Sequence, residues 1–315
     1  SGALQRENVD VRMIVAQEGY STPVKNRIIA DNQQIVRIDH EQIMPLNESL
    51  EQYIIDQLSE LLHGVKIIAI SDYGKGFLTP TLLTALIQKA NQMGIPTITD
   101  PKGHDFKKYH GTTVIKPNLT EAYIAANLPM TTSLENVAAH VLSQCQAQLL
   151  MVTRSEAGIS LFNDVGARFD FPVHAKEVKD VTGAGDTVLA MFAHALANAL
   201  SYEEGAQLCN VAAGIAIEYV GCARVSLSDL ALRLFELNMG HKIFDQEHLF
   251  VLKEVLKRTT FSILMLLQMD ALTPALFQMI KKLSKENESL LIYVDPIELN
   301  EVFLEMLSSL QEVNF

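Results

Sequence analysis

Residues 180–187 read Asp-Val-Thr-Gly-Ala-Gly-Asp-Thr and lead directly into an apolar, helical stretch over residues 188–199. Small residues at 183–185 let the backbone approach an anion closely, and the unpaired N–H groups of a first helical turn point at that anion. The helix dipole favours negative charge at the same place. Asp186 lies in this turn, where it can accept a proton from a hydroxyl held beside the anion. The segment therefore predicts phosphoryl transfer to an alcohol.

A plainer interpretation of the same residues is a glycine-rich helix cap that binds nothing. For a bare Gly-Ala-Gly-Asp, this interpretation carries about half of the weight. The flanking Asp180 and Thr182, together with the apolar helix, make the longer pattern more specific and favour the functional interpretation.

Strand-like and helical stretches alternate along the sequence on the N-terminal side of this segment. Residues 65–70 form a continuous apolar run of the kind that is buried on both faces of a parallel sheet. The spacing of apolar residues predicts further strands at 96–99, 113–115, 148–153 and 158–162, and helices at 48–62, 80–93, 119–127, 133–144, 184–199, 201–219 and 226–237. This order predicts an α/β fold with an open, mostly parallel sheet and helices on both faces.

Two β-branched runs, at 24–29 and 33–39, stand apart from this alternation. Residues 30–32 separate them with a turn-like break, so we expect an antiparallel hairpin over about residues 24–40. Such a two-stranded ribbon is marginal alone and gains stability by packing on another surface.

A boundary at residues 238–241 separates a main domain, residues 1–238, from a C-terminal segment, residues 241–315. We expect this segment to be one βαβ unit with a trailing helix. Its strands are predicted at 261–267 and 290–294, and its helices at 246–257, 274–283 and 297–310. About 75 residues are few for an independent α/β domain.

The composition excludes several classes of protein. The chain has 315 residues, of which 48% are hydrophobic, and this excludes a disordered or collagen-like chain. The net charge of −12 argues against a general attraction to nucleic acid or to an anionic membrane, while a local basic pocket for one phosphorylated ligand stays open. The 3 cysteines form no C-x-x-C motif, which fits a reducing cytoplasm and argues against a disulfide framework.

The segment at 180–187 resembles the signature of the ribokinase-like (PfkB) carbohydrate kinase family, Asp-Thr-x-Gly-Ala-Gly-Asp. Further segments occur in the order found in the heptose-7-phosphate kinase branch of that family, which includes bifunctional heptose kinase/adenylyltransferases. They are Asn-Gln-Gln at 32–34 with Arg37 and Asp39, Ser-Asp-Tyr-Gly-Lys-Gly at 71–76, Asp-Pro-Lys-Gly at 100–103, Pro-Asn-Leu-Thr-Glu at 117–121 and Val-Thr-Arg-Ser-Glu at 152–156. The resemblance covers roughly residues 1–235.

This resemblance implies a ribokinase-like fold in which the hairpin at 24–40 is a small β lid and joins two subunits into a homodimer. It implies that ATP phosphorylates the anomeric hydroxyl of D-glycero-D-manno-heptose 7-phosphate, giving the 1,7-bisphosphate used for ADP-heptose and the lipopolysaccharide core. ATP and Mg²⁺ are the implied cofactors, and a monovalent cation stays open. Two alternatives remain: a kinase of the same fold for another sugar, and a non-catalytic remnant that binds a nucleotide.

The same resemblance gives roles to the residues of the signature. The N–H groups of Gly183, Ala184 and Gly185 would form an anion hole for the transferring phosphoryl group. Asp186 would be the catalytic base, and Thr182 would belong to the ATP-binding part of the motif.

Asn118 and Glu121 match the family's N-x-x-E motif, with Leu119 and Thr120 between them. The resemblance places this motif near the phosphates of ATP, where Glu121 suits a magnesium ion through its water shell. The competing interpretation is a helix capping box, because Asn118 precedes an apolar helix and Glu121 stands three residues later. The residues alone favour neither interpretation, and the family pattern favours the functional one.

Thr153, Ser155 and Gly158 match a strand-end loop that the family uses along the nucleotide. Loops at the carboxyl ends of strands bind ligands in open α/β folds. Asn210 matches a position near the adenine, and an ordinary residue on a helix surface is an equal alternative.

Four residues are expected to bind the sugar substrate: Asp72, Lys75, Lys102 and Arg37. Asp72 and Lys75 follow the predicted strand at 65–70 and so lie at the ligand edge of the sheet. Lys75 and Lys102 can meet phosphate charge, although a lysine in a loop is usually only solvated.

The sequence departs from the family pattern at both ends. The family's domain normally opens with a further two or three βα units, on the order of 80–100 residues, which include the first strand and a Gly-Gly motif. Residues 261–276 run parallel to the start of a nucleotidylyltransferase domain, but both histidines of its H-x-G-H motif are missing. We therefore expect the segment at 241–315 to be a degenerate or truncated remnant without adenylyltransferase activity.

Overall fold

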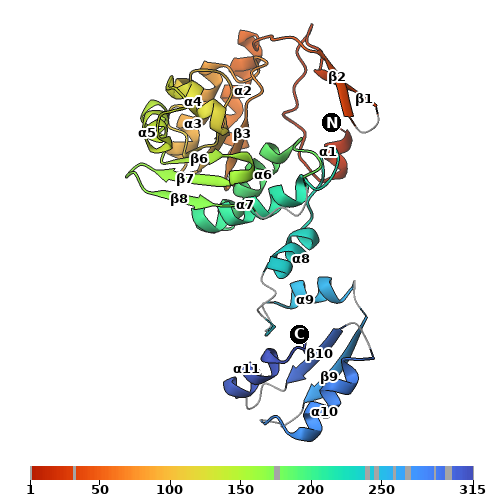
Figure 1. Cartoon of the computed structure of the whole chain (residues 1–315). Helices are drawn as coiled ribbons and strands as arrows, with labels where there is room; N and C mark the ends of the chain where they lie inside the picture. Colours follow the sequence, from red (N-terminus) through yellow and green to blue (C-terminus); the bar gives the residue numbers. More distant parts are fainter. Residues whose placement is uncertain are drawn as a thin grey trace. The chain divides into compact units, whose positions relative to one another are not determined.

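The computed structural model describes residues 2–30, 33–173, 178–237, 242–244, 248–257, 260–266, 271–286, 289–294 and 300–314. The chain divides into two compact units. Figure 1 shows the whole chain, coloured from its N-terminus in red to its C-terminus in blue. The first contains residues 1–174 and 183–213, and the second contains residues 175–182 and 214–315. The boundary predicted at 238–241 lies outside the described residues, so the division into domains at that point stays a prediction.

A six-stranded sheet organises the first unit, in the order β3-β4-β5-β6-β7-β8. Its members are β3 (Ile68–Ser71), β4 (Thr97–Asp100), β5 (Val114–Ile115), β6 (Leu149–Thr153), β7 (Ile159–Asn163) and β8 (Arg168–Phe171). The first four pair in parallel, and the last two continue the sheet in antiparallel fashion. The predicted open, mostly parallel α/β sheet is confirmed.

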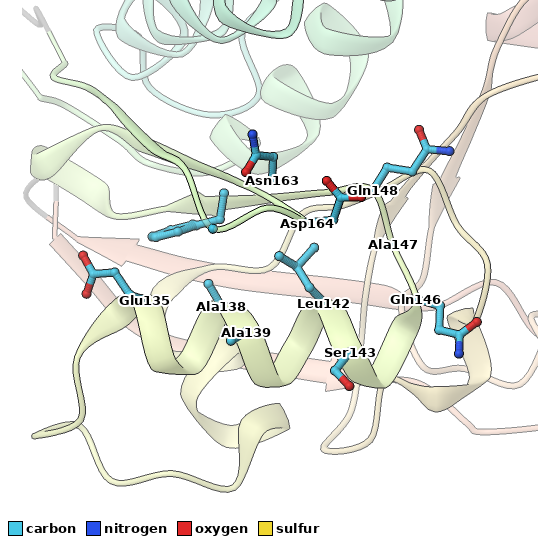
Figure 2. A pocket seen from close by; sticks show the side chains of 12 residues that line it. Glu135, Ala138, Ala139, Leu142, Ser143, Gln146, Ala147, Gln148, Asn163 and Asp164 are labelled. Carbon is cyan, nitrogen blue, oxygen red and sulfur yellow. The ribbon is translucent and has the colours of Figure 1, made fainter.

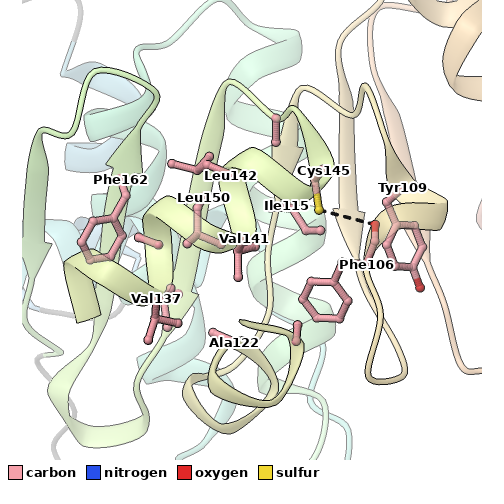
Figure 3. Close-up of a cluster of buried hydrophobic side chains, with 14 of the residues drawn as sticks. Phe106, Tyr109, Ile115, Ala122, Val137, Val141, Leu142, Cys145, Leu150 and Phe162 are labelled. Atoms are coloured by element: carbon pink, nitrogen blue, oxygen red, sulfur yellow. Dashed lines mark hydrogen bonds between the residues drawn. The ribbon is translucent and has the colours of Figure 1, made fainter. Parts of the chain in front are cut away.

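Helices cover both faces of this sheet because alternate residues of each strand point to opposite sides. They are α2 (Glu48–Leu61), α3 (Pro80–Gln92), α4 (Leu119–Ala126), α5 (Leu134–Cys145), α6 (Ala184–Ala197) and α7 (Tyr202–Ala216). On one face, Leu150 and Val152 of β6 share a buried cluster with α3, α4 and α5, part of which is drawn in Figure 3. On the other face, Leu149 and Met151 pack with α6 and α7. Among the described residues, no helix is both long enough and apolar enough to cross a membrane.

Two strands differ from the sequence-based prediction. The apolar run at 65–70 forms a strand only from Ile68, and Ala69 is exposed. The expectation of burial on both faces is wrong there because, within the described residues, β3 is an edge strand that pairs only with β4. The second difference is β8, whose short Arg-Phe-Asp-Phe sequence is mostly exposed and was not predicted.

The predicted hairpin is present. β1 (Val24–Ala30) and β2 (Gln33–His40) pair in antiparallel fashion, with Ile28 opposite Val36. The turn residues 31 and 32 lie outside the described residues. Before the hairpin, a short helix, α1 (Gly2–Arg6), begins the chain's described part.

The second unit contains the predicted βαβ arrangement. Its elements are α8 (Leu227–Leu237), α9 (Leu249–Leu256), β9 (Phe261–Leu266), α10 (Pro274–Leu283), β10 (Ser289–Val294) and α11 (Glu301–Ser309). β9 and β10 pair in parallel, with Ile263 opposite Leu291. Leu266, Ile280 and Phe303 belong to a buried cluster that joins this pair to α10 and α11.

Candidate active site

The carboxyl ends of four neighbouring strands bring polar residues to one edge of the sheet in the first unit. Asp72 directly follows β3, Asp100 ends β4, Lys116 directly follows β5 and Thr153 ends β6. Because β3 to β6 run in parallel, these ends lie side by side. This edge is where open α/β folds bind ligands.

The first turn of α6 carries the predicted anion-binding residues. Gly183 is the N-cap at φ 83°, a left-handed conformation that favours glycine, and it has no side chain with which to cap the helix. The N–H groups that open an α-helix have no partner within the helix. Gly185 and Asp186 are exposed, so this turn is open to a ligand from solvent.

Tyr73 links the β3 end of the sheet edge to α6. Its hydroxyl donates a hydrogen bond to Asp186 Oδ1 at 3.1 Å. Tyr73 is exposed, but the partial burial of its ring, followed by the negative charge of Asp186, raises the pKa of Tyr73, so the phenol keeps its proton and remains a donor. Sequence analysis assigned no role to this residue.

Asp72 is buried, and both oxygens of its carboxylate accept hydrogen bonds. Oδ1 accepts a hydrogen bond from the Gly74 N–H at 2.7 Å, and Oδ2 accepts from Lys108 Nζ and Tyr109 Oη, both at 2.6 Å. Burial raises the pKa of Asp72, but these hydrogen bonds outweigh it and leave the pKa below the ordinary value. Sequence analysis missed Lys108 and Tyr109, which lie more than 30 residues from Asp72 along the chain.

The buried Lys116 forms an ion pair with the half-buried Asp100, with Lys116 Nζ 2.9 Å from Asp100 Oδ2. The Lys116 side chain is only 3% exposed. Burial raises the pKa of Asp100 despite this cation, and the charges of Glu121 and Asp186 add to the rise. A Cβ atom placed on Gly185 would lie 3.8 Å from Lys116 Nζ, so a buried positive charge lies next to the first turn of α6.

The capping interpretation of Asn118 and Glu121 is confirmed. Asn118 Oδ1 accepts a hydrogen bond from the Glu121 N–H at 2.9 Å, and Glu121 Oε2 accepts from the Asn118 N–H at 3.1 Å. Lys102 Nζ donates to Glu121 Oε1 at 2.9 Å, and this bond raises the pKa of Lys102. Leu119 is half-buried and Thr120 is exposed in the same turn. The role of Glu121 toward magnesium stays a prediction.

Gly158 and Asn210 both lie next to the backbone carbonyl of Phe171. A Cβ atom on Gly158, at φ 81°, would lie 2.0 Å from the Phe171 oxygen, so only glycine fits. Asn210 is buried, and its Nδ2 donates to the same oxygen at 2.7 Å. The interpretation of Asn210 as a surface residue is therefore wrong, because it supports the end of β8. Ser155, between Thr153 and Gly158, is exposed.

The remaining predicted residues lie near the hairpin or in the second unit. Lys75 Nζ forms an ion pair with Glu41, in the segment that follows β2. Arg37 Nε donates to Asp39 Oδ1 at 2.8 Å within β2. In the described part of the chain, no hydrogen bond or ion pair joins Arg37 or Lys75 to Asp186. Thr182 belongs to the second unit, where its N–H donates to Asp180.

The described residues form no group of three or more His, Cys, Asp or Glu side chains that could hold a metal ion. A cavity of about 440 Å³ in the first unit lies between α5 and the turn after β7 (Figure 2). Gln148 lines this cavity and directly precedes β6, so the cavity lies at the opposite end of that strand from Thr153. The candidate site is therefore an open sheet edge rather than this cavity.

A family model described as pfkB family carbohydrate kinase matches residues 2–229. The chain belongs to this family. The match includes the sheet edge and the first turn of α6, so the geometry described above is that of a carbohydrate kinase fold.

Similar proteins with curated descriptions point to one group within the pfkB family. The bifunctional protein HldE of Trichlorobacter lovleyi is 42% identical over 258 residues, which cover 81% of this chain and 52% of that protein. The bifunctional protein HldE of Campylobacter jejuni is 38% identical over 266 residues, covering 83% of this chain and 56% of that protein. The chain thus spans about half the length of the curated relatives it matches.

Solved structures of pfkB-like kinases share the fold. Phosphofructokinase-2 from Escherichia coli, in complex with potassium, matches with a TM-score of 0.63 and 21% identity, over 75% of this chain and 77% of that chain. Ribokinase from Giardia lamblia matches with a TM-score of 0.59 and 16% identity, over 73% of this chain and 77% of that chain. At these identities the matches establish the ribokinase-like fold alone.

Proposed function

We propose that this chain contributes an ATP-dependent sugar kinase that phosphorylates the anomeric hydroxyl of D-glycero-D-manno-heptose 7-phosphate. The product would be the 1,7-bisphosphate, an intermediate toward ADP-heptose and the lipopolysaccharide core. The observation that carries the proposal is the exposed Asp186 carboxylate beside the uncapped first turn of α6. The similarity to the bifunctional HldE proteins supports the choice of sugar.

Asp186 would act as the proton acceptor. The anomeric oxygen forms a bond to the γ-phosphorus of ATP while the bond from that phosphorus to the bridging oxygen of ADP breaks. The hydroxyl proton passes to the Asp186 carboxylate. The transition state of phosphoryl transfer is loosely bonded, so the attacking hydroxyl needs little activation. A carboxylate of ordinary basicity is therefore a sufficient base.

The first turn of α6 would stabilise the transferring group. The N–H groups of Gly183, Ala184 and Gly185 supply donors that are already oriented, so little reorganisation accompanies the reaction. The buried ammonium of Lys116 lies next to this turn and adds positive charge in a region of low dielectric constant.

The side chains at the sheet edge that could ligate a metal suit a magnesium ion that is also bound by ATP. They do not suit an ion bound by the chain alone. No group of three acidic, histidine or cysteine side chains is present among the described residues. Glu121 is held by Asn118 and Lys102, with its carboxylate half-buried at the edge. It would bind the ion through water, which suits the strongly hydrated Mg²⁺. The ion would neutralise phosphate charge, and no residue of the described chain identifies a monovalent cation site.

Residues along β6 and α7 would contact the nucleotide through the loop they support. Thr153 ends β6 and Ser155 is exposed just beyond it, while Gly158 and Asn210 fix the adjoining end of β8. The sugar phosphate would lie on the β3 side, near Lys75, Lys102 and Arg37, because these cations complement its charge.

A phosphoryl-transfer assay tests the choice of substrate. The chain is incubated with ATP and Mg²⁺, and with heptose 7-phosphate, ribose or fructose 6-phosphate as acceptor. Transfer to heptose 7-phosphate above both competitors supports the proposal, and preference for a competitor indicates a kinase for another sugar. Binding of ATP without transfer to any sugar indicates a non-catalytic remnant.

The hairpin would serve as a lid and as a dimer contact. Ile28, Val36 and Ile38 are 44–49% exposed, which is a large exposure for branched apolar side chains. Two such ribbons packed on each other would remove this surface from water. Sedimentation at tens of micromolar tests the contact, and a monomer at that concentration contradicts the dimer without contradicting the lid.

A further inference from the structure

The turn after β3 brings one tyrosine to the predicted proton acceptor. The Tyr73 hydroxyl donates to Asp186 Oδ1 at 3.1 Å, although the two residues are 113 positions apart. In the part of the chain that the structure describes, no other side chain donates a hydrogen bond to this carboxylate. The bond therefore holds one oxygen of Asp186. The lone pairs of the other oxygen stay available to accept a hydrogen bond from the sugar hydroxyl that receives the phosphoryl group.

The direction in which Tyr73 leaves β3 is itself fixed. The Asp72 carboxylate, 4% exposed, accepts from the Gly74 N–H and so closes the turn around Tyr73. Lys108 and the buried Tyr109 donate to the second oxygen of Asp72 and hold the carboxylate in place. Removing any of these donors would leave the buried carboxylate with one hydrogen bond fewer, which would lower the stability of the fold.

We propose that Tyr73 is a positioning residue for Asp186: its phenol holds the carboxylate with one oxygen free to face the acceptor hydroxyl. The consequence for catalysis rests on the proposed kinase function. The hydrogen bond between the two side chains does not, and it exists whether or not the chain turns over a substrate. If Tyr73 merely lined a sugar pocket, its ionisation and its NMR signal would not depend on the side chain at position 186.

Nuclear magnetic resonance of tyrosine labelled with ¹³C at Cζ tests the hydrogen bond without turnover. The Tyr73 signal is assigned by its loss in Tyr73→Phe, and its position is followed from neutral to alkaline pH in the wild type and in Asp186→Asn. Beyond the effect of burial, the charge of Asp186 and its hydrogen bond raise the pKa of Tyr73, so we expect a shifted signal at neutral pH and earlier ionisation in Asp186→Asn. A Tyr73 signal that is the same in both proteins at every pH overturns the proposal.

Tyr53 provides the matched control, because it is an exposed tyrosine on α2. Its signal, assigned by Tyr53→Phe, should be identical in the wild type and in Asp186→Asn. If Asp186→Asn displaced both signals equally, the change would be a general perturbation, and the specific link between Tyr73 and Asp186 would be refuted.

A double-mutant cycle measures the catalytic consequence. We expect Tyr73→Phe to lower kcat by roughly 3- to 10-fold, the effect of one hydrogen bond, with the KM for ATP unchanged. In the Asp186→Asn background the same change should have no further effect, because the carboxylate to be positioned is gone. Equal factors in both backgrounds overturn the positioning role. A wild-type chain without kinase activity refutes the proposed function, and the resonance experiment then still decides this inference.

Discussion

The first turn of α6 and the first turn of α10 are both helix N-termini, but they offer a ligand different groups. At α10, the Thr273 hydroxyl accepts a hydrogen bond from the Leu276 N–H at 3.2 Å, and Pro274 has no N–H. At α6, Gly183 provides no such cap, and Asp186 adds a carboxylate. A helix N-terminus is therefore available to an anion only where the chain has not satisfied those donors with its own side chains.

The positive charge near the two turns also differs, and it too favours an anion at α6. Beneath the α6 turn lies the buried ammonium of Lys116, paired with Asp100. Near α10, the sequence contains no basic residue between Arg258 and Lys281. The α6 turn thus combines open donors with a nearby cation, as the charge of a transferring phosphoryl group requires.

Asp186→Asn gives the largest expected effect on the α6 turn. It keeps the volume of the side chain and removes the proton acceptor, so turnover should fall by about 10²–10⁴. ATP affinity should change little, because in the proposed mechanism backbone donors would hold the phosphates. Steady-state kinetics and calorimetric titration with ATP measure the two quantities.

The matched control for this change is Asp164→Asn, at an exposed aspartate beside the cavity of Figure 2. It removes one carboxylate from the same unit and should leave turnover unchanged. Wild-type turnover in Asp186→Asn would remove Asp186 from the mechanism.

Lys116→Met tests the charge beneath the α6 turn. It leaves the half-buried Asp100 without its cation, and we expect a loss of up to about 3 kcal/mol in the free energy of unfolding at pH 8. Burial raises the pKa of Asp100, so the folded state binds a proton at this carboxyl more readily than the unfolded state does. The stability that this carboxyl provides is present at low pH and is lost as the pH rises through its folded pKa.

The cost of Lys116→Met should therefore be smallest near about pH 4 and grow toward pH 8. Urea unfolding at several pH values measures it. Lys107→Met, at an exposed lysine, is the control and should be neutral throughout. A loss that does not vary with pH would show that Asp100 is not the group left without a partner.

Gly185→Ala should separate stability from activity at the same turn. Among the described residues outside the helix backbone, the added Cβ comes within 4 Å of Lys116 Nζ alone, at 3.8 Å, so the methyl group fits. Alanine favours a helix over glycine, and the free energy of unfolding should rise by about 0.5 kcal/mol. The methyl group would also stand where the backbone approaches the anion, so turnover should fall roughly tenfold. A parallel fall in stability and turnover would contradict this explanation.

The sequence predicted the elements whose burial pattern is regular. Leu149 to Val152 form a continuous apolar run because both faces of β6 are covered. β8 escaped prediction because an edge strand with Arg168 and Asp170 has little apolar pattern. The missed strand also explains Asn210: a lone asparagine in a helix resembles a surface residue until the Phe171 carbonyl is placed beside it.

The same distinction holds at the candidate site. A local motif made Asp186 and the glycines beside it candidates, because the chemistry predicted for them depends on adjacent residues. Tyr73, Tyr109 and Lys116 were missed because their partners are distant in sequence or become buried only when the sheet forms. A lysine directly after a buried strand was the one available signal for Lys116.

The smallest expected effect concerns the α10 turn, where we expect no chemistry at all. Adenylyl transfer must stabilise negative charge on the attacked α-phosphate while pyrophosphate leaves. The Thr273 cap and Pro274 leave few donors free in this turn, and both suit the start of an ordinary helix. Incubating the chain with heptose 1-phosphate and labelled ATP should yield no nucleotide-linked heptose above a blank without protein. Product that disappears when residues 241–315 are deleted would show that α10 acts on phosphates despite its cap, and the contrast with α6 would fail.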